Sequence, residues 1–137
     1  MARFVAAQDA AGWEEIVTEL RRGRKTGHWI WFVFPQLRGL GRSTMAERYG
    51  IADLQEARRY LAHPVLGPRL REAVALLVAH QDRTAEAMLG GLDAMKFRSS
   101  LTLFGVAEEA GVFGEALAQF YDGREDPLTR RMLAATA

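Results

Sequence analysis

The residues best suited to binding chemistry lie in one aromatic, basic and glycine-rich segment, residues 23–43. It holds two of the three tryptophans, Trp29 and Trp31, next to His28. From residue 21 to residue 46 the chain carries six basic residues and no acidic residue. Such a local positive field concentrates anions, and glycines let backbone N–H groups approach a ligand closely. The segment therefore predicts a site for a small anionic ligand.

Within this segment we expect the side chains of Phe32 and Phe34 to be buried in the core. Five other side chains are expected to form a polar or stacking rim: Lys25, His28, Trp29, Trp31 and Gln36. A structural interpretation stays open, in which the aromatic residues form a buried wedge with solvated arginines at its ends. Neither of the two common glycine-rich phosphate-loop patterns is present, so the prediction rests on residue types and charge.

A second segment, residues 93–104, places two cations and three hydroxyl groups along a helical apolar stripe. Lys96, Arg98 and Ser99 supply hydrogen-bond donors for an anion if this segment folds beside the first. We therefore expect these three side chains to meet Lys25 across one pocket. The alternative is a helix on which the two cations are simply solvated.

The histidines and the lack of cysteine bear on metal and acid–base chemistry. His28, His63 and His80 do not have the four-residue spacing of a helical metal site. No cysteine is present, which excludes thiolate ligands and a thiol nucleophile, and we expect neither a metal nor a cofactor. His28 is the one candidate acid–base group and should join Lys25 in the pocket. The alternative is a histidine packed beside Trp29 and bonded to a backbone carbonyl.

No sequence pattern identifies a catalytic residue. A Gly-x-Ser-x-Gly motif is absent, and Ser99-Ser100 has no partner base nearby in the sequence. Two function classes stay open: a site for a small anionic or nucleotide-like ligand, and a non-catalytic helical module that recognises or regulates a protein. A concave pocket containing both segments favours the first class, whereas an exposed apolar patch favours the second.

Helices must position these side chains, because apolar residues recur at spacings of three and four. Strand pairs joined by Asn-Gly or Asp-Gly turns are absent. We predict an all-α fold: a compact single-domain bundle over residues 1–137, with about six or seven helices and little or no sheet. The apolar run 29–34 is too short for its period to distinguish a strand from a helix. The main stripes cover residues 13–20, 54–61, 66–78, 97–104 and 113–121.

Length and charge restrict the partners further. The chain has 137 residues, of which 49% are apolar, and this suits one globular core. With 18 basic and 17 acidic residues the net charge is +1, so a nucleic-acid partner is not expected. No apolar run approaches the roughly 20 residues of a membrane span. We expect a soluble cytoplasmic protein without membrane association, whose partner is a small anion or another protein.

Three motifs carry a resemblance to a known family. They are His28-Trp29-x-Trp31-x-x-Phe34-Pro35-Gln36, Gly39-Leu40-Gly41-x-Ser43 and Lys96-x-Arg98-Ser99-Ser100-x-Thr102-Leu103-Phe104. With these motifs the chain resembles the bacterial family called domain of unknown function 1810, whose members are often labelled "calpastatin". The resemblance covers about residues 3–133. It implies a mainly α-helical fold and transfers no catalytic residue or cofactor.

Overall fold

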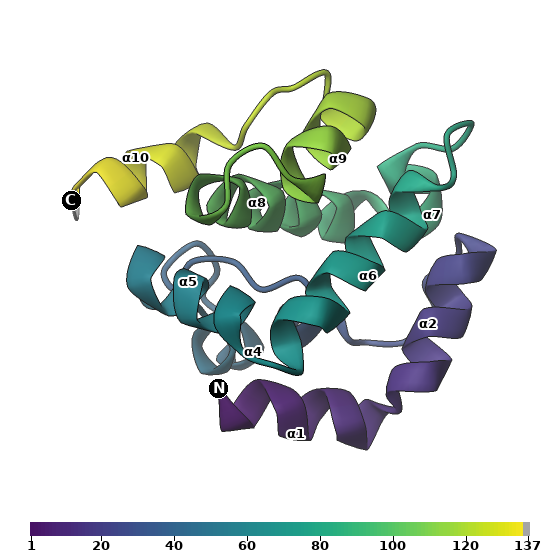
Figure 1. The fold of residues 1–137 in the computed structure, drawn as a ribbon, viewed down its shortest axis with the longest axis horizontal. Helices are drawn as coiled ribbons and strands as arrows, with labels where there is room; N and C mark the ends of the chain where they lie inside the picture. The colour runs from purple at the N-terminus through teal and green to yellow at the C-terminus, as the bar shows by residue number, and fades with distance from the viewer. Residues whose placement is uncertain (136–137) are drawn as a thin grey trace.

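The computed structural model describes residues 1–135, which form ten helices. In chain order they are α1 (Ala2–Ala11), α2 (Trp13–Arg22), α3 (Ile30–Val33), α4 (Thr44–Arg48), α5 (Leu54–Ala62), α6 (Leu66–Val78), α7 (Ala85–Leu89), α8 (Gly91–Ala107), α9 (Val112–Tyr121) and α10 (Pro127–Ala135) (Figure 1). Within residues 1–135 the extended pairing is limited to one parallel bridge between Leu37 and Ile51. The all-α prediction is confirmed, whereas the predicted number of six or seven helices is wrong.

The number of helices is higher because three of them are about one turn long. Helices α3, α4 and α7 have four or five residues each, too few to repeat the 3.6-residue period that identifies a helix in the sequence. The run 29–34, which fitted a strand or a helix, contains α3. Ile30, Phe32 and Val33 are all buried, whereas Trp31 is half-buried. Most of this short helix therefore packs into the core, and its sequence is apolar on every side.

Side-chain caps fix where several helices begin. Ser43, Asp53 and Thr84 each accept a hydrogen bond from the backbone N–H three residues later, at 2.8–3.1 Å. Such caps satisfy N–H groups that have no partner within the helix. His63 ends α5, and its Nδ1 accepts from two backbone N–H groups at the start of α6.

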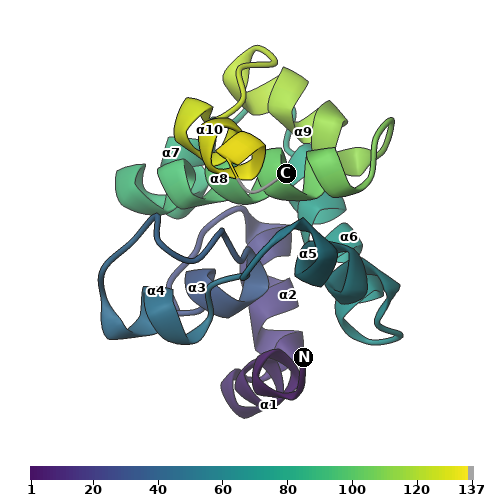
Figure 2. The same cartoon turned by 90° about the vertical axis from the view of Figure 1, so that its left-hand side faces the viewer.

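Helix α8 runs through the middle of the molecule. Helices α9 and α10 lie on one side of it, and α1 to α5 lie on the other (Figures 1 and 2). Phe97 and Phe104 of α8 are fully buried. The Phe97 ring centre lies 4.7 Å from that of Phe34, and the Phe104 ring centre lies 5.3 Å from that of Tyr60. These aromatic contacts hold α8 in place and leave part of its N-terminal half facing solvent.

A buried carboxamide joins the aromatic segment to the N-terminal helix. The Nε2 of Gln8 donates to the carbonyl oxygen of Phe32 at 2.8 Å and to the hydroxyl of Tyr60 at 3.2 Å. Arg69 donates to the Gln8 Oε1 at 3.2 Å. Burial raises the pKa of the Tyr60 hydroxyl, which therefore stays protonated and neutral. The cluster fixes α3 against α1 and α5.

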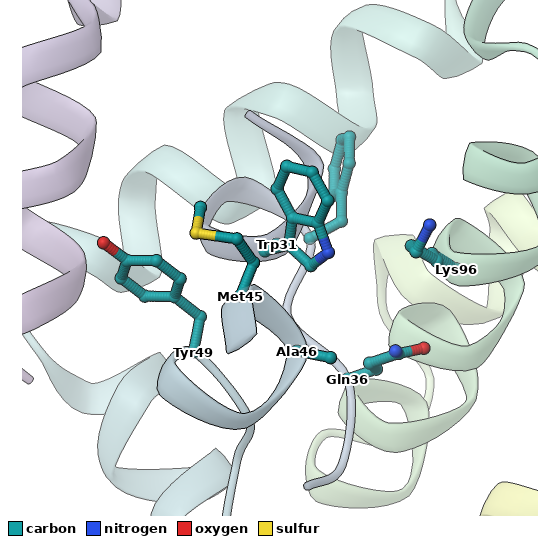
Figure 3. A pocket seen from close by; sticks show the side chains of 7 residues that line it. Trp31, Gln36, Met45, Ala46, Tyr49 and Lys96 are labelled. Carbon is teal, nitrogen blue, oxygen red and sulfur yellow. The ribbon is translucent and has the colours of Figure 1, made fainter. Parts of the chain in front are cut away.

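The loop after α3 is anchored by the bridge between residues 37 and 51. The Arg38 N–H donates to the Ile51 carbonyl at 2.8 Å, and the Ile51 N–H donates to the Gln36 carbonyl at 2.9 Å. A Cβ at Gly50 would lie 2.7 Å from the Arg38 Cα, so only glycine allows this close approach. The anchored backbone directs the Gln36 side chain toward α8 (Figure 3).

Candidate functional site

Helix α8 presents a second stripe of side chains to a surface groove. Leu92, Met95, Lys96 and Ser99 follow the i, i+3, i+4, i+7 spacing and therefore share one helix face. The groove has a volume of about 270 Å³. It is completed by the loop after α3 and the start of α10, with Gln36, Leu40, Gly41, Asp126 and Leu128.

A narrower cavity adjoins this groove, and the two share the side chains of Gln36 and Lys96. Its other walls are aromatic or apolar: Trp31, Phe34, Met45, Ala46 and Tyr49 (Figure 3). The centre of a water molecule can occupy about 10 Å³ of it, which is close to the minimum that one water requires. The groove and this inner cavity together are called the Lys96 site below.

Three polar side chains at the Lys96 site have hydrogen-bonding capacity that the protein leaves unused. Neither the Trp31 indole N–H nor the Gln36 amide bonds to any residue in the range 1–135. The Lys96 ammonium lies 3.5 Å from a carboxylate oxygen of Asp93 and 5.7 Å from the centre of the Trp31 ring. All three groups can donate hydrogen bonds, so the site complements an oxygen-rich or anionic group.

Asp93 is shared by two lysines. Its carboxylate lies 2.8 Å from the Lys25 ammonium and 3.5 Å from the Lys96 ammonium. One carboxylate between two ammonium groups leaves a net charge of +1. The Lys25 side chain is only 8% exposed, whereas that of Lys96 is 28% exposed. Lys96 is therefore the cation of the pair that a ligand can reach.

The loop that carries Lys25 is folded around the carboxylate of Glu19. The Glu19 Oε1 accepts hydrogen bonds from the backbone N–H groups of Thr26 and Gly27, at 2.6 and 2.8 Å, and from the Trp29 indole N–H at 3.1 Å. Burial raises the pKa of Glu19, but these hydrogen bonds outweigh it, and the pKa lies below its ordinary value. The Lys25 ammonium also donates to the Gly27 carbonyl at 2.5 Å. Lys25 thus ties this loop to the start of α8.

The predicted site residues fall into two groups in the structure. Trp31, Gln36, Lys96 and Ser99 line the Lys96 site, so both sequence segments contribute to it. The other four predicted residues line neither the groove nor the inner cavity: Lys25, His28, Trp29 and Arg98.

Trp29 and Lys25 differ from their expected roles for identifiable reasons. Trp29 was expected at the rim, but it is 2% exposed and its indole N–H is bonded to Glu19. Lys25 was expected to line the pocket, but its ammonium pairs with Asp93 and its side chain is almost buried. Counting charges between residues 21 and 46 cannot reveal a carboxylate supplied by a helix that starts far along the chain.

Arg98 and His28 also lie outside the Lys96 site. The guanidinium of Arg98 donates to the carbonyl oxygens of Arg124 and Glu125, both at 2.8 Å, and so ties α8 to the loop before α10. His28 is exposed and makes no hydrogen bond within residues 1–135. The interpretation of His28 as a histidine bonded to a carbonyl beside Trp29 is therefore wrong.

Asp126 places a carboxylate at the α10 end of the groove. Its Oδ2 accepts from the Thr129 N–H at 3.0 Å, from the Thr129 hydroxyl at 2.5 Å and from the Ser99 hydroxyl at 3.3 Å. The hydrogen bonds from Thr129 cap α10. The second oxygen, Oδ1, has no hydrogen-bond partner within the described range 1–135. The groove therefore has a cation at Lys96 and an anion at its α10 end.

Sequence reasoning missed the apolar walls of the groove. Leu92, Met95 and Leu128 are 76%, 68% and 45% exposed, and all three line it. The first two were detectable, because with Lys96 they form a helical stripe separate from the buried stripe of Phe97. Leu128 gave no such signal, since only the tertiary fold brings α10 to α8.

The described residues contain neither a metal-binding cluster nor a membrane-spanning helix. No group of three or more His, Asp or Glu side chains within residues 1–135 is placed to hold a metal ion. None of the helices in this range has the length and apolar character needed to cross a bilayer.

Comparisons with known proteins place the site in a wider context. A family model described as "Protein of unknown function (DUF1810)" matches residues 1–133, a range that includes every residue of the Lys96 site. The comparison with curated proteins finds no match. Among solved structures, the chain is similar to the conserved hypothetical protein Rv1873 from Mycobacterium tuberculosis, whose crystal structure was determined at 1.38 Å. The identity is 51% and the TM-score 0.94, over 97% of this chain and 95% of that chain.

Proposed function

We propose that this chain, which belongs to the DUF1810 family of proteins of unknown function, binds a small anionic ligand at the Lys96 site. One observation carries the proposal: three donors with unused capacity surround a single, largely apolar cavity (Figure 3). Trp31 contributes its indole N–H, Gln36 its amide and Lys96 its ammonium group. A hydrogen bond to a charged group contributes about 1.5–3 kcal/mol, and three such donors converge on this one cavity.

The three donors have different roles in this proposal. Lys96 supplies the charge, and it attracts the anion from the open groove. Trp31 and Gln36 supply directed N–H donors, which select an acceptor with oxygen atoms in defined positions. Because the inner cavity has room for about one water molecule, it accommodates a single oxygen of the anion, and the rest of the ligand lies in the groove.

Thermal unfolding in inorganic phosphate tests the proposal. Binding to the native state raises the unfolding midpoint by mass action. At constant ionic strength, with chloride as the reference, we expect phosphate to raise the midpoint and Lys96→Met to remove most of this increase. The control is Arg21→Met, which removes the same charge from an exposed position on α2 that lines neither cavity. Equal phosphate effects in the parent and in Lys96→Met would overturn the proposal.

Protein recognition is a second candidate function, supported by the exposed apolar side chains of Leu92, Met95 and Leu128. Exposed apolar patches rimmed by polar groups mark interaction sites in many proteins. If the groove recognises a second copy of the chain, sedimentation velocity at rising concentration will show association that Leu92→Gln abolishes. A single monomeric species at all concentrations contradicts this form of recognition.

A further inference from the structure

We infer that the ligand of the Lys96 site is a free monocarboxylate with a short hydrocarbon chain. The inference rests on the proposed function and adds the chemical class of the ligand. The carboxylate lies between the Lys96 ammonium, the Trp31 N–H and the Gln36 amide. The hydrocarbon chain lies in the groove between α8 and the start of α10.

The apolar walls of the groove favour a ligand with a hydrocarbon chain. Leu92 and Met95 precede Lys96 on the same face of α8, and Leu40 and Leu128 line the groove from other elements. Leu92 is four residues from Lys96, about 6 Å along the helix axis. A chain attached to a carboxylate at Lys96 therefore passes between apolar side chains on both sides. Its burial removes apolar surface of both protein and ligand from water, which favours binding.

The polar groups of the groove are too few for a sugar or a nucleotide. Apart from Gln36 and Lys96, its polar side chains are Ser99 and Asp126, and these two are bonded to each other at 3.3 Å. A ribose presents several hydroxyl groups, and each loses free energy if it is buried without a hydrogen-bond partner. The groove therefore suits a hydrocarbon body better than a nucleoside.

The charges favour a ligand with a single negative charge. Lys25, Asp93 and Lys96 together carry +1, so one carboxylate neutralises them. A second negative charge further along the chain would approach Asp126, whose Oδ1 is not hydrogen-bonded within residues 1–135. Like charges at short range repel each other, so the groove discriminates against dicarboxylates.

Isothermal titration calorimetry with acetate, butanoate, hexanoate and adipate tests this inference at constant ionic strength. Burying one methylene group strengthens binding about fourfold, so hexanoate should bind about 15-fold more tightly than butanoate. Adipate has the six-carbon chain of hexanoate with a second carboxylate, and we expect it to bind at least about tenfold more weakly. Equal affinities for acetate and hexanoate, or equal affinities for hexanoate and adipate, would overturn the inference.

Two variants assign the effects to the two ends of the ligand. The double variant Leu92→Gln, Met95→Gln changes exposed side chains only. Phosphate should still raise its unfolding midpoint, whereas its affinity for carboxylates should depend less on the length of the hydrocarbon chain. Lys96→Met should weaken all carboxylates alike.

The failures of the two proposals are distinguishable. If phosphate stabilises the protein through Lys96 but hexanoate binds no better than acetate, the present inference is wrong and the proposed function stands. If affinity rises with the length of the hydrocarbon chain but Lys96→Met binds hexanoate as tightly as the parent does, both proposals are wrong.

Discussion

The chain has two lysines, Lys25 and Lys96. The carboxylate of Asp93 gives Lys25 a structural role and leaves Lys96 available to a ligand. Both contact Asp93, but Lys25 is closer, almost buried and also bonded to the Gly27 carbonyl. Lys96 has one long ionic contact, and its side chain lines both the inner cavity and the groove (Figure 3). Residue type alone predicts the same role for both, whereas their partners give them different roles.

Asp93→Asn should change binding and stability in opposite directions. The substitution raises the charge of the lysine pair from +1 to +2, so hexanoate should bind about fivefold more tightly, which corresponds to a Coulomb attraction of about 1 kcal/mol. The same change removes two partly buried ion pairs and should lower the free energy of unfolding by about 1–2 kcal/mol. Calorimetry and urea unfolding measure the two effects. Weaker binding in Asp93→Asn would show that the carboxylate positions Lys96 more than it neutralises it.

Glu19 predicts a defined pH dependence of stability. Its pKa in the folded protein lies below the ordinary value of 4.5, so its contribution is complete above that value and is lost as the pH falls through the folded-state pKa. Glu19→Gln should therefore lower the free energy of unfolding by about 1–2 kcal/mol at neutral pH. Urea unfolding should show this difference shrinking as the pH falls below the ordinary value of 4.5. A difference that is constant from neutral to acidic pH contradicts the assigned role of the carboxylate.

At the scale of elements, α8 serves two purposes through two faces. Phe97 and Phe104 pack into the core, while Leu92, Met95 and Lys96 face the groove. A helix with one apolar stripe is easily recognised in the sequence. For this reason the bounds of α2, α5 and α9 were predicted to within a few residues. In α8 the groove-facing stripe is separate from the buried stripe. Its polar members, Lys96 and Ser99, were predicted from residue type, whereas its apolar members, Leu92 and Met95, were not.

Two glycines test how closely helices pack. A Cβ at Gly67 of α6 would collide with the Leu61 carbonyl oxygen of α5, whereas at Gly91 of α8 it would meet no atom within 4 Å. Gly67→Ala should lower the free energy of unfolding by about 1–3 kcal/mol. Gly91→Ala should leave it unchanged or raise it by up to about 1 kcal/mol, because alanine favours the helix. Thermal unfolding compares the two, and equal midpoints would contradict the packing of α5 against α6.

At the scale of the whole molecule, the Lys96 site exists because distant parts of the chain meet. The loop after α3, helix α8 and the start of α10 contribute Gln36, Lys96 and Asp126. The sequence identified the first two by residue type and local charge. It could not show which side chains lie across from them, because that depends on the core formed by Phe34 and Phe97. The fold class followed from local periodicity, whereas the site needed the tertiary contacts.

The measurement that tests the central claim most directly is a titration of the protein with hexanoate, followed in ¹⁵N–¹H correlation spectra. The three tryptophans differ in their surroundings: the indole N–H of Trp13 is bonded to Glu72, that of Trp29 is bonded to Glu19, and that of Trp31 faces the cavity. We predict that hexanoate shifts the signals of the Trp31 indole and the Gln36 amide and leaves the other two indoles unchanged. Binding that leaves the Trp31 signal in place, or that shifts the Trp13 signal instead, would contradict the account.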